Sequence, residues 1–93
     1  MSKPVLGFVG LTHLGLCYSA ASAEKGFKVY AFDKDNEKIK KLLKLEIDIY
    51  ENNLNKLIKK NLNKNLTFNN SFTYLKKCDV VFISEDIPTK KKW

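Results

Sequence analysis

The feature that most constrains this chain is a glycine-bearing turn between two short apolar segments. Residues 5–9 are almost entirely apolar, residues 10–15 read G-L-T-H-L-G, and a second apolar segment at 28–32 ends in Asp33. Short apolar runs without alternation are typical of strands buried in a parallel sheet. The order strand, glycine turn, helix, strand and acid therefore predicts half of a dinucleotide-binding site.

Each part of this pattern has a physical reason. Gly10 allows a turn that a residue with a Cβ resists, and Gly15 lets the following helix pack closely on the strand. The first N–H groups of that helix have no partners within it, so a pyrophosphate fits there. Asp33 is expected to accept hydrogen bonds from a ribose diol and to repel a 2′-phosphate, which favours NAD over NADP. The turn residues predicted to contact the cofactor are Gly10, Leu11, Thr12, His13, Leu14 and Gly15.

Thr12 departs from the G-x-G-x-x-G pattern, because it stands where the middle glycine lets the backbone approach the pyrophosphate. Two outcomes are open: Thr12 displaces the phosphates outward, or it offers them its hydroxyl group. His13 also has two interpretations, as a surface cap of the helix start or as a cofactor contact. A catalytic role for His13 is not expected, because the helix dipole disfavours its protonation there.

Size and composition exclude several classes of protein for this chain. The 93 residues make one small domain. No apolar run approaches the ~18 residues that cross a bilayer, and the first residues lack the form of a secretory signal. We therefore expect a cytoplasmic protein without a membrane partner. Cys17 and Cys78 are too far apart for a C-x-x-C pair, so we predict buried free thiols and no metal site.

The formal net charge of +7 raises the hypothesis of nucleic-acid binding. Every basic residue other than the single histidine is a lysine, so the chain has no arginine to bind guanine or phosphate in a bidentate manner. The lysines are interspersed with Asn, Glu and Asp along the predicted helix faces rather than gathered in one stripe. A solvated surface is the favoured interpretation, and no nucleic-acid partner is expected.

The rest of the chain predicts alternating helices and strands. We expect an α/β fold of the Rossmann type, a doubly wound parallel sheet truncated to about four strands in the order 3-2-1-4. The expected elements are strand 5–9, helix 13–25 ended by Gly26, strand 28–32, a helix capped near Asp35, an extended connection over 45–51, a helix capped by Asn52 or Asn53, strand 66–68, a brief helix capped by Ser71, and strand 79–84.

The last predicted strand places one more segment near the glycine turn. Ligands of open parallel sheets bind beyond the carboxyl ends of the strands, at the switch in strand order. The first and fourth strands flank that switch. The segment 85–89 is therefore expected to lie across the cofactor cleft, with Asp86, Ile87 and Thr89 as further cofactor contacts.

Four segments together resemble a known family, the UDP-glucose and GDP-mannose dehydrogenases, in the NAD-binding domain. They are the turn at 10–15, the acid of Ala31-Phe32-Asp33, the segment Glu46-Ile47-Asp48-Ile49-Tyr50-Glu51, and Phe82-Ile83-Ser84 running into Pro88-Thr89-Lys90. The resemblance covers nearly all of the chain. It implies an enzyme that oxidises the C6 hydroxyl of a nucleotide sugar, such as UDP-glucose, to a carboxylate with NAD as cofactor.

The resemblance also implies roles and gaps. Lys38, five positions after Asp33, is expected to support the adenosine ribose. The catalytic cysteine of the family has no counterpart here, so no catalytic residue is assigned. We read residues 1–93 as a partial NAD-binding domain with a basic tail at 90–93, belonging to a longer protein that binds the nucleotide sugar and forms homo-oligomers through its other parts. The alternative is a non-catalytic remnant or interaction module that binds NAD weakly or not at all.

Overall fold

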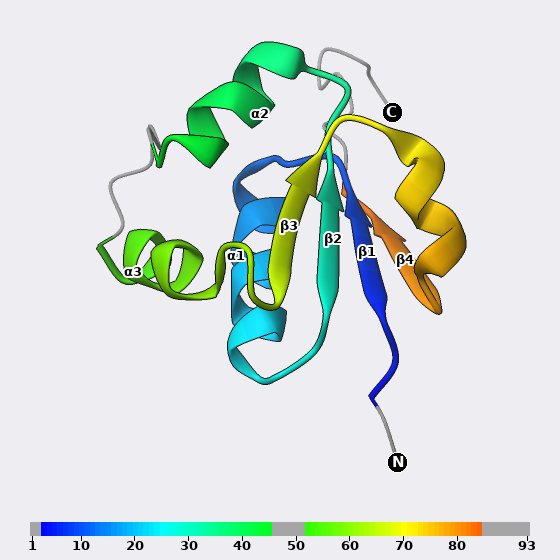
Figure 1. Cartoon of the computed structure of the whole chain (residues 1–93). Coiled ribbons are helices and arrows are strands. Elements are labelled where there is room, and N and C mark those ends of the chain that lie inside the picture. Colours follow the sequence, from blue (N-terminus) through cyan, green and yellow to red (C-terminus); the bar gives the residue numbers. More distant parts are fainter. Residues whose placement is uncertain (1–2, 46–51, 85–93) are drawn as a thin grey trace, which may run out of the picture.

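The computed structural model describes residues 3–45 and 52–84. This part of the chain forms four strands and four helices, with two helices in succession between β2 and β3 (Figure 1). In chain order they are β1 (Leu6–Val9), α1 (His13–Glu24), β2 (Val29–Phe32), α2 (Asn36–Leu43), α3 (Asn52–Asn61), β3 (Leu66–Asn69), the 3-10 helix η1 (Phe72–Lys77) and β4 (Val80–Ile83).

The strands form one parallel sheet in the order β3-β2-β1-β4, which confirms the predicted fold class. Phe8 of β1 lies opposite Ala31 of β2 on one side and Phe82 of β4 on the other. Because β1 pairs with β2 on one side and β4 on the other, the strand order switches at β1. The carboxyl ends of β1 and β4 therefore meet beside the glycine turn, where a parallel sheet binds its ligands.

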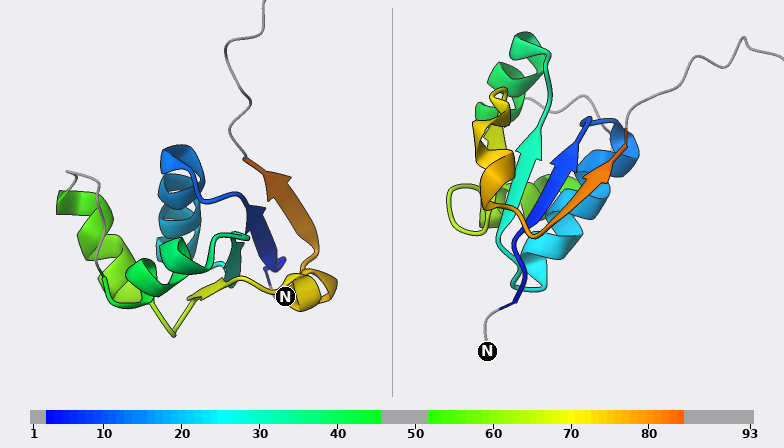
Figure 2. Two further views of the ribbon diagram at one scale, coloured as in Figure 1. Left: turned by 90° about the horizontal axis from the view of Figure 1, so that it is seen from above. Right: turned by 90° about the vertical axis from the view of Figure 1, so that its right-hand side faces the viewer.

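Helices cover the two faces of the sheet unequally. Helices α1 and α3 pack against each other on one face, whereas η1 lies on the opposite face (Figure 2). The buried side of α1 carries small residues, because Ser19, Ala20 and Ala23 are fully buried there. On the other face the ring of Tyr74 in η1 stacks on that of Tyr30 in β2, with centroids 5.2 Å apart.

The helix ends follow the chemistry of their capping residues. Asp35 accepts hydrogen bonds from the backbone N–H groups of Glu37 and Lys38, and Ser71 accepts one from Thr73, as expected of capping side chains. After α1 the chain reverses at Gly26, whose φ of 99° is in the region that favours glycine. The predicted helices are confirmed, but the one after Ser71 is a 3-10 helix. The predicted cap of α3 is wrong, because Asn52 and Asn53 both lie within the helix.

Three other predictions concern the strand ends, the two cysteines and the connection at 45–51. β1 and β2 each begin one residue later than predicted, β4 is one residue shorter at both ends, and β3 extends one residue further, to Asn69. Cys17 and Cys78 are half-buried free thiols rather than buried ones. Of the connection predicted at 45–51, only Leu45 is described, with a φ of 63°, and residues 46–51 lie outside the described part.

The two edges of the sheet differ in their burial. Leu66 and Phe68 of β3 are buried beneath the helices. All four residues of β4 are exposed, although all are apolar. In the described ranges no helix is long and apolar enough to cross a bilayer.

Candidate functional site

The glycine turn joins β1 to α1 through a very close backbone contact. Gly10 has a φ of 94°, a conformation that residues with side chains rarely adopt. A Cβ on Gly15 would lie 2.2 Å from the carbonyl oxygen of Gly10, so only glycine fits at position 15. The two glycines therefore hold the start of α1 directly against the end of β1, as the sequence predicts.

Asp33 follows β2 and its carboxylate reaches across to this turn. Its Oδ2 accepts a hydrogen bond from the backbone N–H of Leu11 at 2.9 Å, and its Oδ1 accepts one from the N–H of Asp35, also at 2.9 Å. Burial alone would raise the pKa of Asp33, but these two hydrogen bonds and the nearby Lys38 ammonium outweigh it, and the pKa is lowered. The carboxylate is thus ionised and fixed beside the turn.

Lys38 completes this arrangement from the first turns of α2. Its Nζ lies 3.5 Å from Oδ2 of Asp33 and donates a hydrogen bond to the carbonyl oxygen of Leu11 at 3.3 Å. The Lys38 side chain is 40% exposed and that of Asp33 is 11% exposed. Leu11, Asp33 and Lys38 therefore form one polar cluster at the carboxyl ends of β1 and β2.

Thr12 is the capping residue of α1, and its hydroxyl group is held on the inner side of the turn. Its Oγ1 accepts a hydrogen bond from the N–H of Gly15 at 3.2 Å and lies 3.1 Å from both the carbonyl oxygen and the hydroxyl of Ser84, just after β4. The hydroxyl is thus engaged by protein groups. Thr12 rather than His13 caps the helix, which corrects the interpretation of His13 as the cap.

The contact between Thr12 and Ser84 ties the glycine turn to the end of β4. The sequence predicts Ser84 at the end of a strand and assigns it no part in the site. The signal was present in the segment Phe82-Ile83-Ser84, since a polar residue directly after a buried parallel strand lies at the edge where ligands bind.

The start of α1 has backbone donors that no acceptor in the described part of the chain engages. Within residues 3–45 and 52–84, the N–H groups of Thr12 and Leu14 donate to no protein acceptor, whereas the N–H of Leu16 donates to the carbonyl of Thr12 at 2.9 Å. The His13 ring lies 3.6 Å from the thiol of Cys17, one helical turn onward. These amides and the positive end of the helix dipole make an environment for an anion.

Some predicted contacts cannot be placed. Asp86, Ile87 and Thr89 lie outside the described residues, so their position relative to the turn stays a prediction. No group of three or more His, Cys, Asp or Glu side chains within the described ranges is arranged to hold a metal ion.

A comparison with protein families decides the identity of the domain. The sequence model of the UDP-glucose/GDP-mannose dehydrogenase family, NAD binding domain, matches residues 5–93. The chain belongs to this family. Its cofactor is accordingly NAD, as the motif and the resemblance predict.

Two proteins of similar sequence are much longer than this member of the family. The uncharacterized protein MJ1054 of Methanocaldococcus jannaschii is 38% identical over 86 residues, which are 92% of this chain and 10% of that protein. The UDP-glucose 6-dehydrogenase TuaD of Bacillus subtilis is 34% identical over 88 residues, which are 92% of this chain and 19% of that protein. The chain thus spans between a tenth and a fifth of these relatives.

Solved structures of the family share the fold. A UDP-glucose dehydrogenase from Pyrobaculum islandicum has a TM-score of 0.82 at 23% identity, covering 90% of this chain and 20% of that one. A GDP-mannose dehydrogenase from Pseudomonas aeruginosa has a TM-score of 0.84 at 24% identity, covering 92% of this chain and 20% of that one.

The residues present fit a dinucleotide. At the start of α1, the N–H groups of Thr12 and Leu14 donate to no acceptor among the described residues, and they match a pyrophosphate. A carboxylate has about four acceptor positions, and backbone N–H groups occupy two on Asp33, which leaves capacity for a ribose hydroxyl.

Proposed function

We propose that this chain is the adenosine-binding part of an NAD-dependent nucleotide-sugar dehydrogenase, which oxidises the C6 hydroxyl of a sugar such as UDP-glucose to a carboxylate. The observation that carries the proposal is the 2.9 Å hydrogen bond from the N–H of Leu11 to Asp33, because it joins the acid that we propose binds the ribose to the turn that we propose binds the phosphates. Family membership and the names of the relatives support the class of substrate.

In this proposal each residue of the site has a separate task. The amides at the start of α1 bind the pyrophosphate, and the Asp33 carboxylate accepts hydrogen bonds from the adenosine ribose. Lys38 adds to the backbone hydrogen bonds that favour the ionised form of Asp33, and it supports the same ribose. Asp86, Ile87 and Thr89 contact the cofactor from the segment after β4. The Thr12 hydroxyl is engaged by Gly15 and Ser84, so Thr12 acts by fixing the turn rather than by binding phosphate.

NAD, when bound, supplies a nicotinamide that accepts hydride from the substrate carbon. The share of this chain is to hold the adenosine end of the cofactor in one place. The residues that act on the sugar belong, in this proposal, to the remainder of a longer protein. The length of the relatives supports this, since the matched part is 19% of the Bacillus subtilis enzyme.

NMR titration of the 15N-labelled chain with NAD and NADP tests the proposal. We expect saturable NAD-induced shifts in residues 10–15 and at Asp33, and much weaker binding of NADP, because the Asp33 carboxylate repels a 2′-phosphate. If the chain binds neither dinucleotide, the alternative holds: the chain is a remnant or interaction module, in line with the loss of the middle glycine at Thr12. Shifts confined to other regions would contradict the assignment of the site.

A further inference from the structure

The β4 edge of the sheet exposes apolar side chains to solvent, which is energetically unfavourable. The exposed fractions of Val80, Val81, Phe82 and Ile83 in β4 are 42%, 41%, 46% and 76%, whereas Leu66 and Phe68 on the opposite edge are 0% and 4% exposed. Strands with apolar residues on both sides are typical of positions covered on both faces of a parallel sheet. Contiguous exposed apolar surface of this kind marks an interaction site.

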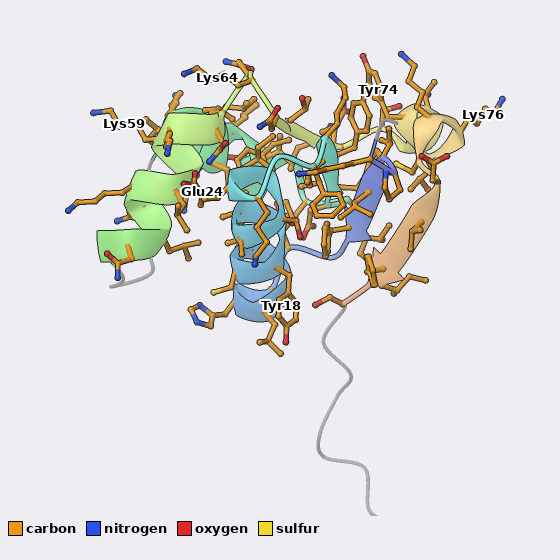
Figure 3. All side chains as sticks on the ribbon, turned by 90° about the horizontal axis from the view of Figure 1, so that it is seen from below. Tyr18, Glu24, Lys59, Lys64, Tyr74 and Lys76 are labelled. Atoms are coloured by element: carbon orange, nitrogen blue, oxygen red, sulfur yellow. The ribbon has the colours of Figure 1, made fainter. Side chains whose placement is uncertain are left out.

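On the face that carries α1, this edge opens into a groove. A pocket of about 450 Å³ lies between α1 and β4, and its lining residues are Leu6, Phe8, Tyr18, Ser22, Phe82, Ile83 and Ser84. Phe82 pairs with Phe8 and shares its face of the sheet, whereas the side chain of Ile83 points to the opposite face. Tyr18 is 56% exposed, and the ring of Phe82 stacks on that of Phe8 with centroids 5.1 Å apart. Figure 3 shows Tyr18 and Tyr74 on opposite sides of the sheet, so η1 does not cover this groove.

We propose that this groove between α1 and β4 docks the apolar face of an amphipathic helix from outside the series of strand-helix-strand units of this sheet. The side chains that line it carry no charge. Three of them carry hydroxyl groups: Tyr18 and Ser22 on α1, and Ser84 just after β4. The matching helix face is therefore an aliphatic or aromatic stripe with room for one polar group, as in other grooves that bind helices.

The handedness of parallel connections excludes one source of this helix, namely a connection from β4 to a further strand at its free edge. Connections between parallel strands of one sheet are right-handed in almost all proteins. Helix α1 connects β1 to β2 on one face, and η1 precedes β4 on the other, where the chain crosses in the opposite direction (Figure 2). A strand that followed β4 at its free edge would place its connecting helix on the η1 face. The α1 face of β4 would stay open, so its cover comes from elsewhere.

A second copy of this chain fits the groove less well. In a dimer with two-fold symmetry the two β4 edges would pair through their backbone groups. Each groove would then lie next to the open groove of the other copy, and neither copy would place a helix in it. The length of the relatives supplies the source of a helix, since four-fifths or more of each protein lies outside the matched part. This inference rests on the fold and does not depend on NAD binding.

The test is titration of the 15N-labelled 93-residue chain with a designed helical peptide that has leucine on one stripe and glutamate elsewhere. We expect one-to-one binding, with shifts at Tyr18, Ser22, Phe82 and Ile83. A peptide of the same composition with its leucines scrambled is the probe control, and it should not bind. NAD affinity is measured on the same sample, so a failure of this inference is distinct from a failure of the NAD proposal.

Two variants on exposed surface locate the binding site. Tyr18→Glu should raise the peptide Kd by about tenfold or more, because it places a charge in the groove wall. Leu43→Glu, at a leucine of α2 that is 48% exposed, should change it by less than about twofold. Equal effects of the two variants, or absence of binding up to about 1 mM peptide, would overturn the proposal. A dimer in sedimentation that Tyr18→Glu converts to monomer would assign the groove to a second copy instead.

Discussion

The backbone N–H of Leu11 donates a 2.9 Å hydrogen bond to Oδ2 of Asp33, so the acid that ends β2 holds the turn that follows β1. The same oxygen lies 3.5 Å from the Nζ of Lys38. Because three elements meet at one carboxylate, Asp33 is both part of the fold and the proposed ribose ligand. Stability and cofactor affinity are therefore expected to respond together to changes at this position.

Replacing Asp33 with Asn should make the stability of the chain less dependent on pH. The lowered pKa of Asp33 means that its ionised form stabilises the folded state above the unfolded pKa of about 3.9, and that this contribution is lost as the pH falls through the folded value. At pH 7 we expect Asp33→Asn to reduce the free energy of unfolding by about 1 to 2 kcal/mol. Urea denaturation at pH 7 and near pH 3 measures the difference, which should shrink at the lower pH.

The matched control for this experiment is Glu37→Gln. Glu37 is exposed and pairs with Lys40 at 3.8 Å, so its loss should have little effect on stability. If Asp33→Asn and the wild-type chain lost stability equally between the two pH values, the ionised carboxylate would not stabilise the turn.

Lys38→Met should raise the pKa of Asp33 and leave the fold in place. The substitution keeps the apolar stem of Lys38 but removes the ammonium that favours the ionised carboxylate. A 13C NMR titration of the carboxyl groups measures this directly. An unchanged pKa would show that the two backbone hydrogen bonds alone hold Asp33 ionised. Lys40→Met is the control, because Lys40 contacts Glu37 instead.

Thr12→Ala should destabilise the chain through the loss of the helix cap. Its hydroxyl accepts the Gly15 N–H and contacts Ser84, so we expect a loss of about 1 kcal/mol in the free energy of unfolding. Thr12→Ser keeps the hydroxyl and should restore most of it. Thr12→Gly should cost only a few tenths of a kcal/mol in capping and keep or tighten NAD binding. Weaker NAD binding by Thr12→Gly would instead identify the hydroxyl as a phosphate ligand.

Gly15→Ala should be among the most damaging single changes in the turn. The new Cβ would lie 2.2 Å from a backbone oxygen that cannot move without displacing β1 or α1. We expect a loss of about 1 to 3 kcal/mol or more. Gly7→Ala is the comparison, because its Cβ would meet the Sγ of Cys78 at 2.7 Å, the end of a side chain that can rotate. Thermal unfolding in which Gly7→Ala is the worse of the two would contradict this geometry.

The sequence could predict the sheet and the turn because their signals are local. A glycine at position 10 and an acid at position 33 act through backbone conformation and strand ends, and strand order follows from the motif. The ends of the short strands are predicted less well. Val5 and Lys28 fall just outside β1 and β2, although their carbonyl oxygens still accept backbone hydrogen bonds from neighbouring segments. Their exclusion depends on pairing partners that composition does not specify.

The direction of the Thr12 hydroxyl could not be predicted from its own segment. Thr12 and Ser84 are 72 positions apart, and their contact depends on the placement of β4 beside β1. The same applies to the bonds that fix Asp33, because the Leu11 amide reaches it only once β1 and β2 pair in register. The exposure of β4 could not be predicted either. An apolar strand predicts burial, and its sequence does not indicate what covers it.

Calorimetric titration of the wild-type chain and of Asp33→Ala with NAD tests the central claim most directly. The account predicts saturable binding by the wild type and a loss of about 1 to 3 kcal/mol in Asp33→Ala, on the scale of a hydrogen bond to a charged group. Equal affinity of the two proteins for NAD, or no heat of binding from the wild type at millimolar NAD, would contradict it.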